Sequence, residues 1–423
     1  MYKKITLPNG LRIIAAPQEN SQTVTVLVLT GTGSKYEPKE INGISHFLEH
    51  MVFNGSKKRP DKKDIMEAMD KVGGISNAFT GYDYTGYWGK ARNENFELAL
   101  DLTADIFLNP LLPQNEIEKE RKVITEELNM YLDDPKIHIE DLWIDLLYGD
   151  CAAGRPIIGN RESLSGINRE KLVSYKQKNY SPANTVVCVA GGIDERDILS
   201  KVEEHFKSFK KEEAPQKEKV LEIQDKPMVS LYEKKTDQAH MMLGTRGYKI
   251  SDSRRYAFSL LSVVLGKGFS SRMFMNIREK LGLSYYLSTS AESDPDTGCL
   301  VTRIGLDNTR VGEGIAAILK EYKIISQEKV PAEELKKAKE IIKGRMAMSL
   351  EPSESLASFY ADQELLEGEI LTPEDIFANI DSVTAEEILA VAQDIFKPEK
   401  LNLALIGPFK EKEEFINLLN SNL

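Results

Sequence analysis

The sequence predicts an α+β fold built from two similar domains, each an antiparallel β-sheet with helices packed on one face. Three observations support this prediction: an internal repeat, a charged segment near the middle of the chain, and strands mixed with helices without strict alternation. We therefore expect an N-terminal domain over residues 1–209, a linker over 210–221 and a homologous C-terminal domain over 222–423.

The repeat is visible in two pairs of matching segments. "HFLEHMVFNG" (46–55) aligns with "SLLSVVLGKG" (259–268), and "YSPANTVVCVAGGI" (180–193) resembles "FKPEKLNLALIGPF" (396–409). Both separations are near half the chain length, which indicates two domains of about 210 residues each. Between them, "KKEEAPQKEK" (210–219) is charged and contains proline, as is typical of a linker.

Within the first half, strand patterns stand at both ends and a helical pattern lies between them. "TVTVLVLTG" (23–31) and "TVVCVAGG" (185–192) are rich in β-branched residues and predict strands. "NEIEKERKVITEELNMYL" (115–132) has a helical period of apolar residues. The order of strands, then helices, then a returning strand favours helices on an antiparallel sheet.

Composition argues against some classes of partner and compartment. The 423 residues include 55 basic and 66 acidic ones, which gives a net charge of −11. This charge disfavours a nucleic-acid partner and mildly favours neutral or basic substrates. The alternative is that the charged residues simply form solvated surface. The longest apolar runs are too short to span a bilayer, and the N-terminal segment has no apolar stretch of signal-peptide length. Three widely spaced cysteines fit a reducing compartment. We therefore expect a cytoplasmic protein without membrane contact.

The segment "HFLEH" (46–50) carries the strongest chemical signal in the chain. On a helix, His46 and His50 lie about 40° apart and face away from the apolar residues of the segment, so their imidazoles can converge on one ion. Catalytic zinc takes three protein ligands and leaves one position for water, on which Glu49 could act as general base. The competing interpretation is a pair of capping or core-edge histidines. The aligned copy has Ser259, Ser262 and Val263 instead, which argues against a purely structural role.

The helix predicted over 115–132 offers carboxylates for a third ligand. Glu120 and Glu127 fall on one semi-buried face beside the apolar stripe, whereas Glu126 faces water. Burying two carboxylates is unfavourable unless a cation or hydrogen bonds compensate them. On spacing alone, an amphipathic helix that happens to be acidic remains an equal alternative.

With these residues the chain resembles the inverted-zincin metallopeptidases, the family of pitrilysin, insulysin and the mitochondrial processing peptidase. The inverted motif is His46-Phe47-Leu48-Glu49-His50, and "ERKVITEE" (120–127) is similar to the distal glutamate motif of that family. The resemblance implies one zinc ion per chain, held by His46, His50 and Glu127, with Glu49 as general base. It also implies a supporting role for Glu120.

Two further segments resemble this family. "GGISNAFTGYDYT" (73–85) is similar to its substrate-binding edge strand, which implies that Asn77 and Ala78 contact the peptide backbone. By pattern alone this segment is a glycine-flanked hairpin. "GKGFSSRMFMNIREKLGLSYY" (266–286) is similar to its C-domain signature, which implies that Arg278 and Tyr285 bind substrate and stabilise the oxyanion. Without the resemblance, Arg278 is an ordinary exposed helix charge.

The resemblance covers nearly the whole chain and implies the short, two-domain branch of the family, in which two chains close into a clamshell. The leading prediction is a zinc metallo-endopeptidase, a homodimer, that cleaves short or unfolded peptides in a closed chamber. The alternatives are a non-catalytic subunit and a chain active only with a distinct partner, as in processing-peptidase complexes. The sequence retains every motif residue that a non-catalytic relative would lose.

Overall fold

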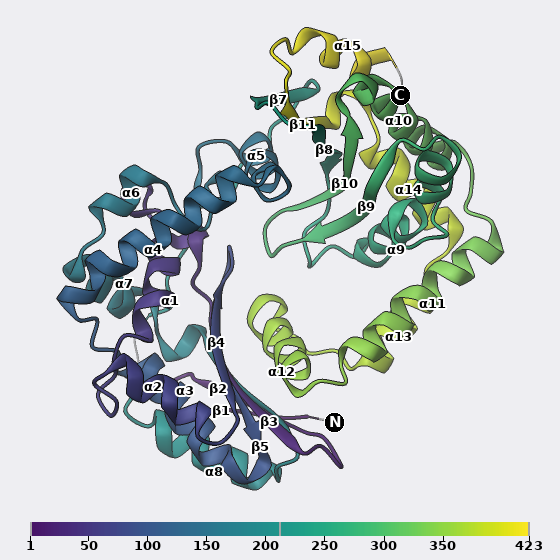
Figure 1. The fold of residues 1–423 in the computed structure, drawn as a ribbon. Helices are drawn as coiled ribbons and strands as arrows, with labels where there is room; N and C mark the ends of the chain where they lie inside the picture. The colour runs from purple at the N-terminus through teal and green to yellow at the C-terminus, as the bar shows by residue number, and fades with distance from the viewer. Residues whose placement is uncertain (1, 211–212, 422–423) are drawn as a thin grey trace. The chain divides into compact units, whose positions relative to one another are not determined.

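The computed structural model describes residues 2–210 and 213–421, and it contains two β-sheets that each form the centre of one compact unit (Figure 1). The first unit consists of Met1–Asn129, Arg155–Glu218 and Met348–Thr372. The second consists of Met130–Gly154, Lys219–Ala347 and Pro373–Leu423. Residues 211 and 212 of the predicted linker lie outside the described residues.

The first sheet is formed by β1 (Lys3–Thr6), β2 (Arg12–Pro17), β3 (Thr23–Thr30), β4 (Ile75–Thr80), β5 (Thr85–Arg92) and β6 (Thr185–Gly191). Their order across the sheet is β1-β2-β6-β3-β5-β4, so β4 is an edge strand. All neighbours are antiparallel except β2 and β6, which run parallel.

The second sheet is formed by β7 (Met228–Glu233), β8 (Gln238–Arg246), β9 (Ser284–Ser293), β10 (Gly298–Asp307) and β11 (Leu401–Gly407). Its order, β7-β11-β8-β10-β9, repeats that of β2-β6-β3-β5-β4, and β7 and β11 form the corresponding parallel pair. The predicted α+β class and the internal repeat are therefore confirmed. The parallel pair in each sheet is a detail that the predicted antiparallel arrangement lacks.

The helices of the first unit are α1 (Ile44–Val52), α2 (Lys62–Asp70), α3 (Phe96–Leu108), α4 (Gln114–Asp133), α6 (Arg161–Gly166), α7 (Arg169–Asn179), α8 (Glu195–Phe206) and α12 (Ser353–Asp362); α4 ends in the second unit. Those of the second unit are α5 (Pro135–Tyr148), α9 (Arg255–Gly266), α10 (Val311–Gln327), α11 (Ala332–Ser349), α13 (Pro373–Ser382), α14 (Ala385–Ile395) and α15 (Glu413–Ser421); α11 ends in the first unit. A π-helical segment, Phe274–Lys280, precedes β9. No helix within 2–210 or 213–421 is long and apolar enough to cross a membrane.

Helices cover both faces of each sheet, which corrects the prediction of helices on one face only. In the first unit, α3 packs on β3 and β5, while α12 packs on the opposite face, where Leu27 and Cys188 belong to its apolar cluster. In the second unit, α9 covers one face and α5 the other, with Trp143 of α5 fully buried. The physical reason is that β6 and β11 are buried along their whole length, so both faces are apolar and both must be covered.

The two covering helices come from the other half of the sequence. α5 belongs to the N-terminal half but packs on the second sheet, and α12 belongs to the C-terminal half but packs on the first (Figure 1). Each compact unit therefore includes a helix from the other half of the sequence, while the predicted bounds 1–209, 210–221 and 222–423 stay a prediction. An amphipathic helix shows which of its faces is apolar, but not which sheet will cover that face.

Candidate metal centre and active site

Helix α1 is fixed in the first unit by a buried apolar side and by a carboxylate at its N-terminus. Phe47, Leu48 and Met51 are fully buried, which directs the intervening polar residues to the other side of the helix. Glu37 accepts hydrogen bonds from the backbone N–H groups of Gly43 (2.6 Å) and Ser45 (2.8 Å), a favourable position for a negative charge. Burial raises the pKa of Glu37 to about 7, although these hydrogen bonds oppose the shift.

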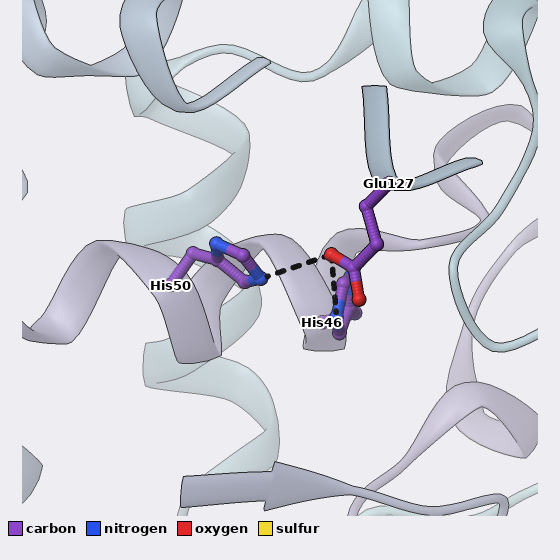
Figure 2. A group of neighbouring side chains, drawn as sticks. All are labelled: His46, His50 and Glu127. Atoms are coloured by element: carbon purple, nitrogen blue, oxygen red, sulfur yellow. Dashed lines mark ion pairs between the residues drawn. The ribbon is translucent and has the colours of Figure 1, made fainter. Parts of the chain in front are cut away.

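Three side chains converge on one point beside α1 (Figure 2). Nε2 of His46 lies 3.8 Å and Nε2 of His50 lies 3.5 Å from Oε2 of Glu127, which comes from α4. One potential ligand atom of each residue lies within 4.8 Å of the other two. The structure thus brings together the two histidines and the glutamate that the resemblance implies as ligands. Glu126, by contrast, is exposed, as its position on the helix predicts.

Glu120 holds the second histidine from the side opposite the shared point. Its Oε2 lies 3.3 Å from Nδ1 of His50, while its Oε1 accepts hydrogen bonds from Asn54 (3.1 Å) and Lys62 (3.1 Å). Asn54 also donates to the carbonyl oxygen of His50 (3.1 Å). With its Nδ1 proton directed at Glu120, His50 presents the lone pair of Nε2 to a metal, an arrangement common around zinc-ligating histidines.

Burial and the neighbouring charged groups shift the pKa values of this cluster in opposite directions. Burial lowers the pKa of His46 to about 4, with a further contribution from the positive charge of His50. Burial also acts to lower the pKa of His50, but hydrogen bonds to Glu120 and Glu127 outweigh it and raise that pKa to about 9. The hydrogen bond from His50 lowers the pKa of Glu120 to about 2.

Glu49 lies on α1 between the two histidines and contacts the edge strand of the sheet. Its Oε2 accepts a hydrogen bond of 2.6 Å from the hydroxyl of Thr80, the last residue of β4. Burial raises the pKa of Glu49, while the hydrogen bond from Thr80 opposes this. A carboxylate with a raised pKa, held in one orientation, is suited to accept a proton near neutral pH.

The remaining predicted residues lie on three other segments. Asn77 is exposed and Ala78 buried on β4, and the Ala78 N–H donates to Oδ1 of Asn77 (2.9 Å). Arg278 and Tyr285 belong to the second unit. Arg278 stacks over the ring of Phe274 at 4.7 Å, and Tyr285 is 80% exposed.

Sequence reasoning missed three residues that contact the cluster: Asn54, Lys62 and Thr80. Asn54 follows His50 by four residues, so helical spacing could have placed it beside that histidine. Lys62 and Thr80 approach only through tertiary structure, because each lies on a different element from α1. No local pattern distinguishes them from other surface residues.

The donor set fits zinc. Two imidazole nitrogens and one carboxylate oxygen form a common ligand set of catalytic zinc, and three protein ligands leave a position for water or substrate. The buried Nδ1 of His46 has no hydrogen-bond partner in the described part of the chain, whereas Nδ1 of His50 is held by Glu120. A carboxylate beside two half-buried imidazoles is an arrangement that a divalent cation would stabilise.

The duplicated α+β domain, with this donor set and the adjacent Glu49 in one copy, has the pattern of the inverted-zincin family. Residues 12–161 match the family described as "Insulinase (Peptidase family M16)", and residues 166–342 match "Peptidase M16 inactive domain". The latter half carries Ser259, Ser262 and Val263 at the motif positions.

Full-length relatives agree with this assignment. The uncharacterized zinc protease YmxG of Bacillus subtilis is 36% identical, covering 96% of this chain and 98% of its own length. An uncharacterized zinc protease of Streptomyces coelicolor is 31% identical, covering 97% of this chain and 90% of its own. A protease from Helicobacter pylori has the same fold, with a TM-score of 0.90 at 24% identity, covering 96% of this chain and 99% of that one. The chain belongs to peptidase family M16.

Proposed function

We propose that this chain is a zinc-dependent metallo-endopeptidase that cleaves short or unfolded peptides. The observation that supports this most directly is the convergence of His46, His50 and Glu127 on one point, with Glu49 on the same helix as the two histidines. The relatives from Bacillus subtilis and Streptomyces coelicolor are both named zinc proteases, which points to the same chemistry. The names of these relatives mention no substrate, so the cleavage of short or unfolded peptides is part of the proposal.

In this proposal His46, His50 and Glu127 hold the metal, and Glu120 keeps His50 in its ligating orientation. Zinc, when bound, would polarise the scissile carbonyl and make water more acidic. Glu49 accepts the proton of the attacking water and returns it to the leaving amine, while Thr80 keeps the carboxylate oriented. Its raised pKa makes Glu49 a stronger base than a carboxylate in water.

The site of peptide binding in this proposal is the edge of β4 that faces away from β5. An edge strand can pair with an extended peptide through main-chain hydrogen bonds, which gives affinity with little demand on sequence. The Ala78 N–H now donates to the side chain of Asn77, and a peptide carbonyl could replace that acceptor. Arg278 and Tyr285 are assigned to substrate binding and oxyanion stabilisation.

The assembly proposed for this activity is a homodimer whose chains close into a clamshell around the substrate. One chain contains both the metal-binding residues and the segment with Arg278 and Tyr285, so a second, specialised subunit is not required. The competing proposal is a chain active only with a distinct partner. Light scattering of the purified protein, combined with peptide cleavage, separates them: an active dimer supports the first, and an inactive protein of any size favours the second.

Metal analysis and the Glu49→Gln variant test the activity itself. We expect one zinc per chain in both proteins, and a loss of peptide cleavage of about 10²- to 10⁴-fold in the variant, because the amide cannot accept the proton. Glu126→Gln, on the exposed side of α4, is the matched control and should retain full activity. A metal-free wild-type protein, or a fully active Glu49→Gln variant, would falsify the proposal.

A further inference from the structure

A cavity of 410 Å³ lies in the first unit, on the face of the sheet opposite α1 and α3. Strands β3, β4 and β5 form its floor, and α12 with the end of α11 forms its wall. Its volume falls in the range of sites that bind small ligands or side chains. The lining residues are Thr25, Leu27, Phe79, Trp88, Ser349, Leu350, Glu354, Ser355, Ser358, Phe359 and Asp362.

The lining combines flat apolar surfaces with two carboxylates. Phe79, Trp88 and Phe359 supply aromatic surface, which favours both aliphatic chains and cations. Glu354 is already neutralised by Lys90, whose Nζ lies 2.6 Å from its Oε2. Asp362 therefore decides the charge preference of the cavity.

Asp362 is a carboxylate without a counter-ion. Within residues 2–210 and 213–421, no lysine, arginine or histidine forms an ion pair with it. Lys4 and Arg12 pair with Glu364, two residues further along the chain, at 2.8 and 3.7 Å. Burial raises the pKa of Asp362 to about 7, because the charged form of a carboxyl group is unfavourable away from water. A cation entering the cavity would relieve this cost.

The cavity and the metal centre face opposite sides of the same edge strand. Thr80 of β4 contacts Glu49 on one face, and the neighbouring Phe79 lines the cavity on the other. The cavity face continues through Trp88 and Leu27, which are paired across β5 and β3. Because side chains alternate along a strand, a peptide paired with β4 would direct every second side chain to the cavity side.

We infer that this cavity binds a lysine or arginine side chain of the peptide substrate, with Asp362 as the counter-ion and the aromatic residues around the aliphatic stem. This inference rests on the proposed peptidase function for the identity of the ligand, but not for the cation site itself. The aliphatic part of either side chain matches the apolar walls, and its charged end matches Asp362. The proposed enzyme therefore prefers basic peptides.

Direct binding tests the cation site without cleavage. The probes are N-acetyl-arginine methylamide and its neutral isostere N-acetyl-citrulline methylamide, titrated at pH 8, above the pKa of Asp362. Trp88 lines the cavity, so its fluorescence reports occupancy, and calorimetry gives the affinity. We expect the arginine probe to bind at least about tenfold more tightly, as a charge-assisted bond to a carboxylate would give. The isosteric Asp362→Asn variant should reduce this ratio towards one, and Glu351→Gln, an exposed carboxylate just before α12, should not change it.

Cleavage of matched peptides that differ only by arginine or citrulline tests the substrate assignment. The ratio of kcat/KM for the two peptides should exceed about tenfold in the wild type and fall towards one in Asp362→Asn. Equal binding of the two probes, or a ratio unchanged in Asp362→Asn, overturns the cation site. Selective probe binding with equal cleavage of the peptides overturns the substrate assignment alone. Selective binding with no cleavage of any peptide refutes the proposed peptidase activity while leaving the cation site in place.

Discussion

Replacing Glu120 by Gln should weaken zinc binding about 10- to 100-fold, although Glu120 is not itself a ligand in our assignment. Its carboxylate accepts the Nδ1 proton of His50 at 3.3 Å and bonds to Asn54 and Lys62 at 3.1 Å each. The first contact lowers the pKa of Glu120 to about 2 and, together with Glu127, raises the pKa of His50 to about 9. The variant keeps the shape of the side chain but removes its charge.

The magnitude follows from the kind of hydrogen bond that is lost. A bond between an imidazole and a carboxylate contributes about 1.5–3 kcal/mol, and a neutral amide retains only part of it. Each 1.4 kcal/mol corresponds to a tenfold change in affinity, so about one to two factors of ten are expected. Folding should be preserved, because the isosteric amide can still accept from Asn54 or Lys62.

A zinc titration against a competing chelator measures the effect directly. Glu126→Gln, an exposed charge on the same helix, is the control for a general change in electrostatic potential. If Glu120→Gln bound zinc within about twofold of the wild type, the orientation of His50 would not depend on Glu120. If Glu126→Gln lost as much affinity as Glu120→Gln, the effect would come from net charge and not from the hydrogen bond.

Three further predictions concern stability. The pKa of Glu120 is lowered from 4.5, so the stability it contributes is complete above pH 4.5 and is lost as the pH falls towards 2. The pKa of His50 is raised from 6.5, so the stability it contributes is complete below pH 6.5 and is lost as the pH rises through 9. The difference in Tm between metal-free wild type and Glu120→Gln should therefore be largest between pH 4.5 and 6.5, and a difference that does not vary with pH would contradict this. Gly43→Ala should lower the free energy of unfolding, measured by thermal denaturation, by about 1–3 kcal/mol, because φ is 94° and the added Cβ would meet a backbone oxygen at 2.5 Å. Gly73→Ala is the control and should lower it less, because φ is 63° and the space around this residue is open. Trp143→Ala, on α5, should lower the free energy of unfolding in urea by about 3–5 kcal/mol. A loss below about 1 kcal/mol would show that the packing of α5 on the second sheet contributes little to stability.

The parts of the site that share one helix could be predicted from the sequence because helical geometry is local. The spacing of His46 and His50 fixes their common face, and the distance of seven residues between Glu120 and Glu127 fixes theirs. Glu126 is exposed and Glu127 is half-buried, as that geometry predicts. The contacts from Lys62 and Thr80 could not be predicted in this way, because they depend on the packing of separate elements.

By itself the sequence determined that there are two related α+β domains, that one copy carries a His-Glu-His helix, and that an acidic helix could supply a third ligand. These properties follow from periodicities of the chain and from comparing one half with the other. Only the tertiary structure decided that α5 and α12 each cover the sheet of the other half, and that a cavity lined by Asp362 lies between α12 and the first sheet. The physical reason is that an apolar helix face is satisfied by any apolar sheet of matching shape, so the choice of partner is made by the packing of the whole chain.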